Sequence, residues 1–308
     1  MGAQDSATPP AGSDQDDRAA AVAAIQQHDS KWIVLDSSLA LNEKTNWKPD
    51  LRQSDRLLHL SLTGDLPAAW LRRMSAAVDS GLKVTFATTA TMLDLEVLAS
   101  LQELDAPIFT VNVEATPPRV TEHRSVADLV ADERYFLDPG SLRTLARARL
   151  QQALTTTENH KKGRWFEEVL CLIFSQVSWL TVDYHAYNNE TEEIDLVMGC
   201  RAVAGYVTGL VGGPIIIATA KNENKATNSQ TVKYLKEQVA NRKGRCKLGF
   251  LCSASSISDD ARGEILRGSQ SGEIVIPCVD REVLEHLIER ADELDSEIEG
   301  LISKAIAD

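Results

Sequence analysis

The sequence predicts an α/β protein with two domains, each built around its own sheet. The chain has 308 residues, more than one hydrophobic core usually serves. In its first half, short apolar runs alternate with segments of helical period, which is typical of a parallel sheet covered by helices. In its second half the expected order is a helix, three successive strands, a helix, a strand, a helix, a strand and a final helix.

The first domain is predicted over residues 29–120 as a small parallel-sheet α/β domain. We expect strands at 31–36, 56–64, 83–90 and 107–113, and helices at 67–81 and 92–106. Pro67 near the first turn and Gly81 just past the end delimit the first of these helices. Residues 1–28 are rich in Ala, Asp, Ser, Gln and Pro, and we predict a disordered tail there, ending in a short helix over 19–27.

The second domain is predicted over residues 158–290, after a helical linker at 121–157 and before an acidic C-terminal helix at 291–308. Its first helix has one thick apolar face that includes Phe166, Leu170 and Ile173. The strands are expected at 180–187, 192–199, 214–221, 246–254 and 273–280, with helices at 229–244, 256–269 and 281–308.

The amino-acid composition is typical of a globular protein and argues against several classes of function. The chain is 43% hydrophobic and 25% charged, which is ordinary for a globular protein, and its net charge of −13 argues against indiscriminate coating of nucleic acid. No apolar run approaches the length of a membrane span, and the acidic N-terminus is unlike a secretory signal. Five scattered cysteines favour reduced thiols, so we expect a cytoplasmic protein without a membrane partner.

Two ionisable residues stand in strands that otherwise look buried. Lys221 ends the apolar run Pro-Ile-Ile-Ile-Ala-Thr-Ala-Lys, on the same side of the strand as Thr219. Asp195 lies within Glu-Ile-Asp-Leu-Val on the strand before it. Adjacent strands can bring the two side chains within a few ångströms. From the pattern alone, a partly buried salt bridge and a functional site both remain open.

Four motifs in this order resemble the PD-(D/E)XK nuclease superfamily, and within it the Mrr-like restriction endonuclease branch. They are Gly-Arg-Trp-Phe-Glu at 163–167, Glu-Ile-Asp-Leu-Val at 193–197, Ala-Thr-Ala-Lys-Asn at 218–222, and the segment 248–262. The resemblance covers about residues 158–290. It implies a restriction-endonuclease-like α/β domain with a mixed central sheet.

The resemblance also implies an activity. Asp195 and Glu167 are expected to hold Mg²⁺ or Mn²⁺, and Lys221 to assist the attacking water or the scissile phosphate. The protein is then expected to be an endonuclease that hydrolyses phosphodiester bonds, with DNA favoured, in restriction or anti-phage defence.

One departure from the family pattern leaves a second function open. Thr219 stands where the family usually has Glu or Gln, which removes one anionic oxygen from the expected metal shell. Glu223 and Glu193 are accessory candidates to replace it. The alternative is a catalytically degenerate nuclease fold that serves as a scaffold for nucleic acid or a partner.

A basic stretch contrasts with the acidic chain. Residues 221–247 carry a net charge of +6, and a second cluster precedes Glu167. A solvated helix face and a track for the phosphate backbone are the two interpretations. Aromatic residues are sparse there, so duplex DNA is the favoured partner. The predicted nucleic-acid-binding residues are Lys161, Lys162, Arg164, Lys225, Lys233 and Lys236.

Two further surfaces carry expectations. Residues 280–308 have a net charge of −7 and apolar positions at helical spacing, which predicts either self-association into a homo-oligomer or packing within the domain. In the first domain, Thr63 and Thr88 stand at the carboxyl ends of expected strands, where ligands bind in open α/β sheets. A regulatory small molecule or a partner protein is therefore expected at the first domain.

Overall fold

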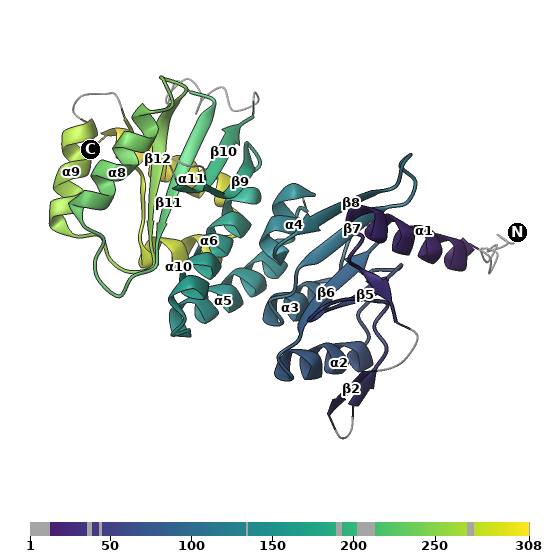
Figure 1. The fold of residues 1–308 in the computed structure, drawn as a ribbon. Coiled ribbons are helices and arrows are strands. Elements are labelled where there is room, and N and C mark those ends of the chain that lie inside the picture. Colours follow the sequence, from purple (N-terminus) through teal and green to yellow (C-terminus); the bar gives the residue numbers. More distant parts are fainter. Residues whose placement is uncertain are drawn as a thin grey trace, which may run out of the picture. The chain divides into compact units, whose positions relative to one another are not determined.

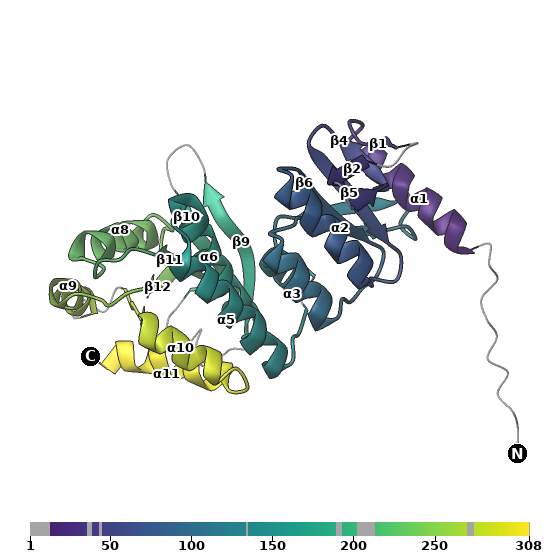
Figure 2. The same cartoon turned by 90° about the horizontal axis from the view of Figure 1, so that it is seen from below.

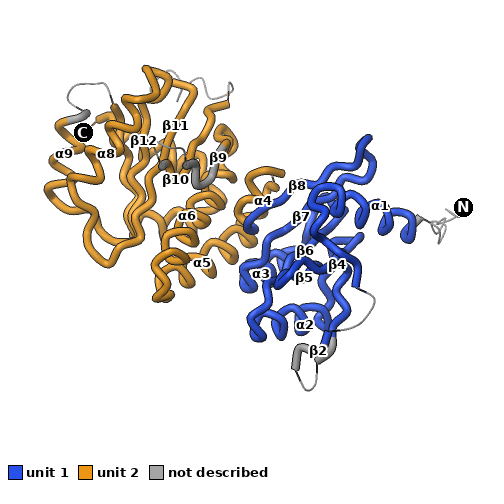
Figure 3. The backbone as a smooth tube through the Cα atoms, in the orientation of Figure 1, with its two compact units in different colours: residues 1–126 blue, residues 127–308 orange. Residues whose placement is uncertain are grey.

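A computed structural model describes residues 13–35, 39–42, 45–133, 135–188, 193–201, 213–269 and 274–307. The chain divides into two compact units, unit 1 at Met1–Val126 and unit 2 at Ala127–Asp308 (Figure 3). Each unit contains a mixed sheet with helices, so the predicted two-domain α/β class is confirmed.

Unit 1 is built on a six-stranded sheet in the order β1-β4-β5-β6-β7-β8 (Figures 1 and 2). Strands β5, β6 and β7 are parallel, as predicted, and the strands on either side are antiparallel to them. The strands are β1 (Ile33–Val34), β4 (Leu51–Gln53), β5 (Arg56–Ser61), β6 (Lys83–Thr88), β7 (Ile108–Asn112) and β8 (Arg119–His123). A separate pair joins β2 (Leu39–Asn42) to β3 (Thr45–Trp47), and the crossover helices are α2 (Ala68–Asp79) and α3 (Leu95–Glu103).

The predicted tail is too long, because helix α1 occupies Ser13–His28. Ala21 and Ile25 are fully buried and belong to a cluster that includes Leu58, Leu60 and Phe109. An alanine-rich segment forms helix readily, and here its apolar face packs on the sheet. Of the predicted tail, residues 1–12 lie outside the described residues.

Unit 2 contains a five-stranded sheet in the order β13-β12-β11-β10-β9 (Figures 1 and 2). Strands β9, β10 and β11 are successive and antiparallel, and β11, β12 and β13 run parallel. The strands are β9 (Leu180–Asn188), β10 (Glu193–Cys200), β11 (Ile215–Lys221), β12 (Cys246–Ser253) and β13 (Cys278–Val279). The helices are α4 (Val126–Asp132), α5 (Pro139–Thr155), α6 (Asn159–Ser175), α8 (Ser229–Ala240), α9 (Asp259–Ser269), α10 (Arg281–Glu289) and α11 (Leu294–Ala307).

The predicted helical linker at 121–157 is not a linker. Residues 121–123 complete β8 of unit 1, and α5 is part of the core of unit 2. Leu142, Leu145 and Ala153 of α5 are almost fully buried, and α5 packs along α6. The sequence did not predict that α5 belongs to the core, because its buried face is narrow and includes a charged residue, Arg149.

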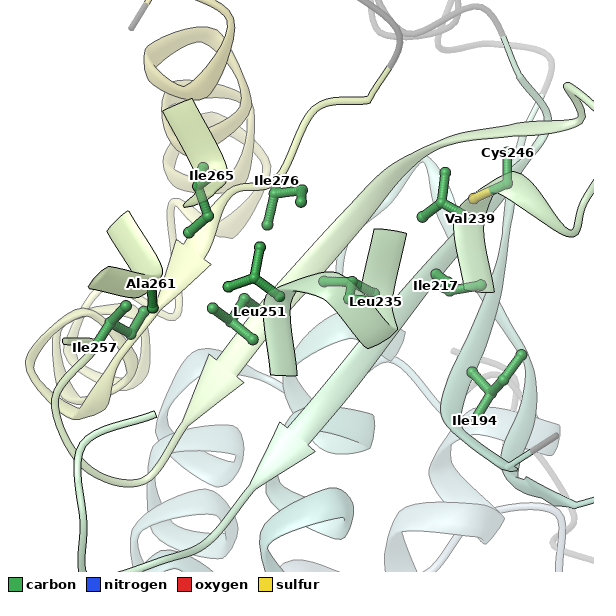
Figure 4. Packing of buried hydrophobic residues seen from close by; sticks show 11 residues of the cluster. Ile194, Ile217, Leu235, Val239, Cys246, Leu251, Ile257, Ala261, Ile265 and Ile276 are labelled. Carbon is green, nitrogen blue, oxygen red and sulfur yellow. The ribbon is translucent and has the colours of Figure 1, made fainter. Parts of the chain in front are cut away.

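Two helix layers cover the sheet of unit 2. Residues of α8 and α9 form a cluster with Ile217 and Leu251 on one face (Figure 4). Phe250, the neighbour of Leu251 on β12, points to the other face and contacts Phe174 of α6, with ring centroids 5.0 Å apart. Gly249 permits the close approach of α8, because a Cβ there would lie 3.0 Å from Leu235.

The predicted C-terminal helix is two helices, and their apolar residues pack within unit 2. Leu284, Leu287 and Ile288 of α10 are buried, as are Leu294, Ile298 and Ile302 of α11. Of the two interpretations of this segment, packing within the domain accounts for these side chains.

Candidate active site

Strand register brings the two ionisable strand residues together. Strands β10 and β11 are antiparallel, with Leu196 opposite Ala218. Continuing that register by one residue places Asp195 opposite Thr219, two residues before Lys221. The apolar residues around Asp195 and Lys221 build two central strands, and the charged groups stand at the same end of both.

Asp195 is held by the strand it faces. Its Oδ2 accepts hydrogen bonds from the backbone N–H of Ala220, at 2.6 Å, and from the hydroxyl of Thr219, at 3.0 Å. Thr219 is only 2% exposed, so its hydroxyl is directed into the protein rather than into solvent. Thr219 therefore acts here as a hydrogen-bond donor to the carboxylate.

The charges of two further predicted residues act on Asp195. Burial raises the pKa of Asp195 to about 6, and the negative charge of Glu167 adds to the rise. The positive charge of Lys221 and the hydrogen bonds from Ala220 and Thr219 act in the opposite direction. Because such charge effects require proximity, Glu167 on α6 and Lys221 on β11 both lie near Asp195.

The two accessory carboxylates lie at the ends of the same two strands. Glu223 is exposed beyond the end of β11. Glu193 begins β10 opposite Asn188, but its side chain lies outside the described residues.

The sequence interpretation missed three residues near the site. Asn222 follows Lys221, and its side-chain amide donates to the backbone carbonyls of Ala153 and Lys162. Glu168 follows Glu167 and forms a buried ion pair with Arg149, with Nε and Oε2 at 2.9 Å. The sequence signal for Arg149 and Glu168 was a charged residue at a buried position of α5 and of α6. Helical periodicity by itself treats such a residue as an irregularity in the apolar pattern.

The predicted nucleic-acid-binding residues differ in their surroundings. Lys225 and Lys233 are exposed, whereas Lys236 is paired with Glu264, with Nζ and Oε1 at 2.7 Å. Lys161 pairs with Glu158, the Lys162 ammonium donates to Asn224 Oδ1, and Arg164 lies 3.6 Å from Glu168. Lys225 and Lys233 are therefore the members of this set whose ammonium groups face solvent.

The basic residues of the stretch 221–247 do not lie together in the structure. Helix α8 carries the chain back to the start of β12, which is parallel to β11. Arg245 and Lys247 therefore lie beside Ile215, at the opposite end of β11 from Lys221. A net charge summed along the sequence overstates the positive charge at the site.

The donor set fits a small divalent cation. Mg²⁺ commonly uses one or two carboxylates and completes its shell with water and phosphate oxygens. Asp195 and Glu167 supply two carboxylates whose mutual repulsion a cation relieves. Among the described residues no group of three or more His, Cys, Asp or Glu side chains is placed to hold a metal, so a larger protein cage is absent from that part of the chain.

Comparisons with protein-family models, with curated proteins and with solved structures gave no match. None of the helices that the structure describes is both long and apolar enough to cross a membrane.

Proposed function

We propose that unit 2 is a metal-dependent endonuclease of the PD-(D/E)XK type that hydrolyses phosphodiester bonds, with duplex DNA as the favoured substrate. The observation that carries the proposal is that Asp195, held by hydrogen bonds from Thr219 and Ala220 beside Lys221, is subject to the charges of both Glu167 and Lys221. The order of elements from α6 to β12 supports it, because a helix, three antiparallel strands, a helix and a parallel strand is the arrangement that the sequence resemblance implies. Restriction or anti-phage defence, in the cytoplasm, is the setting we favour.

Each residue has a chemical task in this proposal. Asp195 and Glu167 would hold Mg²⁺ or Mn²⁺. When bound, the ion supplies positive charge to the phosphate and lowers the pKa of a bound water. Lys221 places an ammonium where negative charge develops on the phosphate during attack. Thr219 and Ala220 keep the Asp195 carboxylate in one orientation.

A cleavage assay tests the proposal. Asp195→Asn and Lys221→Met are each expected to lower the cleavage rate of a duplex DNA by at least about 100-fold in Mg²⁺ or Mn²⁺. Lys247→Met is the matched control, because Lys247 is an exposed lysine at the opposite end of the sheet. Equal activity of all four proteins, or no activity above background in any, would reject the enzyme.

A scaffold is the second candidate, and Thr219 favours it. The buried Thr219 hydroxyl donates to Asp195 where the family pattern places an anionic ligand. A scaffold predicts that labelled duplex DNA binds in fluorescence anisotropy with no cleavage in either metal. Binding should weaken with rising salt, and Lys225→Ala and Lys233→Ala should each lower the slope of that dependence by about one.

Unit 1 is proposed to bind a regulator. An open surface hollow of about 480 Å³ lies at the carboxyl end of β5. His59 lines it, stacks on Trp70 with ring centroids 4.1 Å apart, and places Nδ1 3.2 Å from Asp50. A small molecule or a partner protein binding here would regulate the nuclease of unit 2. Thermal-shift screening of candidate small molecules, with His59→Ala as the control, tests the small-molecule form of this proposal.

A further inference from the structure

Asn222 joins three elements of unit 2 at the end of the strand that carries Lys221. Its Nδ2 donates to the carbonyl of Ala153 at 3.1 Å and to the carbonyl of Lys162 at 2.7 Å. Ala153 lies in the last turn of α5, and Lys162 lies in the first turn of α6. The side-chain amide of Asn222 therefore links the end of β11 to both α5 and α6.

The two carbonyls are suitable acceptors for different reasons. The intrahelical partner of the Ala153 carbonyl would be the N–H of residue 157, which is beyond the end of α5 at Thr155. Asn222 supplies the missing donor from outside the helix. The Lys162 carbonyl belongs to the first turn of α6, where it can accept the intrahelical N–H, and a carbonyl oxygen has a second lone pair for the bond from Asn222.

These contacts set where Lys221 lies relative to α6. Lys162 is five residues before Glu167 on α6, and Asn222 is next to Lys221 on the chain. The preceding two residues, Thr219 and Ala220, hold Asp195. Four consecutive residues thus connect the three elements that carry Asp195, Glu167 and Lys221.

We propose that Asn222 is a positioning residue that fixes Lys221 against the helix bearing Glu167; the catalytic part of this inference rests on the proposed nuclease function. It does not contact the substrate in this role. Removing its amide should misalign Lys221 without removing any charge from the site, and a displacement of about 1 Å commonly costs about 100-fold in rate.

Three variants separate this role from simple support of the fold. Asn222→Ala removes both hydrogen bonds, and Asn222→Asp keeps the shape but replaces the donor by an acceptor facing two carbonyl oxygens. Asn224→Ala is the matched control, because Asn224 is an exposed amide two residues away that accepts from the Lys162 ammonium. Urea unfolding checks that each protein is folded, and Asn222→Ala carries the test if Asn222→Asp does not fold.

We expect kcat of Asn222→Ala to fall by about 10- to 100-fold with little change in KM, and Asn222→Asp to be at least as impaired. Without substrate, the variant should show faster amide exchange over residues 158–168 and altered acetylation of Lys221 by mass spectrometry. Asn224→Ala should match the unmutated protein in all three measurements. A folded Asn222→Ala protein with unchanged kcat, exchange and acetylation would overturn the inference and leave the nuclease intact.

The two proposals fail separately. If the unmutated protein cleaves nothing in Mg²⁺ or Mn²⁺, the proposed function is rejected. The positioning role of Asn222 is then tested by amide exchange and by acetylation of Lys221. If both change in Asn222→Ala, the positioning role stands, and if neither changes, it is rejected.

Discussion

The Asp195 carboxylate determines how unit 2 should respond to pH. Its pKa is about 6 in the folded protein, above the ordinary value of 3.8, chiefly because it is buried. The unfolded chain therefore releases this proton at lower pH than the folded chain does. Asp195 consequently lowers the free energy of unfolding as pH rises from about 4 to about 6, by about 3 kcal/mol in total.

Asp195→Asn should remove this pH-dependent cost. Measured by urea unfolding without divalent cations, the stability of the variant relative to the unmutated protein should increase by about 3 kcal/mol between about pH 4 and about pH 7.5. Asp183→Asn, at an exposed carboxylate of β9, is the control and should show no such trend. If the difference in free energy of unfolding between Asp195→Asn and the unmutated protein did not change with pH, Asp195 would ionise as easily in the folded protein as in the unfolded chain.

Thr219 gives a second prediction at the scale of the residue. Thr219→Val removes a hydrogen bond to Asp195 and should cost about 1 kcal/mol at neutral pH. Thr219→Glu should cost more, because it places a carboxylate in a position that is 2% exposed and next to Asp195. Mn²⁺ should recover more stability in Thr219→Glu than in Thr219→Val, because the new carboxylate adds a ligand to Asp195 and Glu167, and urea titrations with and without the ion will show the difference. Equal recovery in both variants would contradict the assignment of this position to the metal site.

At the residue scale, sequence reasoning found the charged group and missed the residues that hold it. Lys221 and Asp195 stood out because charge is costly in a buried strand. Asn222 did not, because an asparagine after a strand is also typical of a turn. Only the packing of α5 and α6 at that end of β11 gives its amide two acceptors.

At the scale of elements, the contact between α5 and α6 contains a buried ion pair. Arg149 and Glu168 are 1% and 2% exposed, and Arg149 also lies over the ring of Trp165 at 5.4 Å. Two desolvated charges stabilise each other, but either one left alone is costly. The pair therefore joins the two helices beside the candidate site.

Glu168→Gln should lower the free energy of unfolding of unit 2 by about 3–5 kcal/mol. Arg149→Met should lower it by less, because Arg164 also lies 3.6 Å from Glu168 and still pairs with that carboxylate. The double variant should lose less than the sum of the two, because neither charge is then left unpaired. Arg147→Met is the control on the same helix: Arg147 is exposed, and its ion pair with Glu289 should contribute no more than about 1 kcal/mol. Additive losses in the double variant, measured by denaturant unfolding, would show that the pair is not coupled.

Elements with a strong apolar pattern were predictable, and those that depend on distant contacts were not. The strands β5, β6, β7 and β9 to β12 follow from their apolar runs, as does α6. Strand β4, which lies between β1 and β5, and the edge strand β8 are short and polar, and they form because neighbouring strands offer hydrogen bonds. Helix α5 reads as a polar linker until its contacts with α6 are seen.

At the scale of the molecule, each unit has its own hydrophobic core. The cluster around Ile25 and Leu58 lies within unit 1, and the cluster around Ile217 and Leu251 lies within unit 2. The boundary at residues 126 and 127 falls at the first turn of α4. Two closed cores predict two folding units.

A polypeptide of residues 125–308 should therefore fold alone. We expect a cooperative thermal transition, helical and strand signals in circular dichroism, and the same stability loss on Glu168→Gln as in the full chain. A polypeptide of residues 158–290, the predicted domain, is the comparison: it lacks α5 and α11 and should be poorly folded. Cooperative folding of the shorter piece would show that these helices are dispensable.

The two hydrogen bonds to Asp195 Oδ2 bear on ion selectivity. In the described chain, Oδ1 has no such bond, so an incoming ligand would meet one free oxygen of this carboxylate rather than a chelating pair. Calcium takes six to eight oxygen ligands in a flexible shell that includes bidentate carboxylates, whereas magnesium requires a near-octahedral shell and keeps several waters. The hydrogen bonds from Ala220 and Thr219 thereby favour magnesium at this carboxylate, and calcium should compete poorly for it.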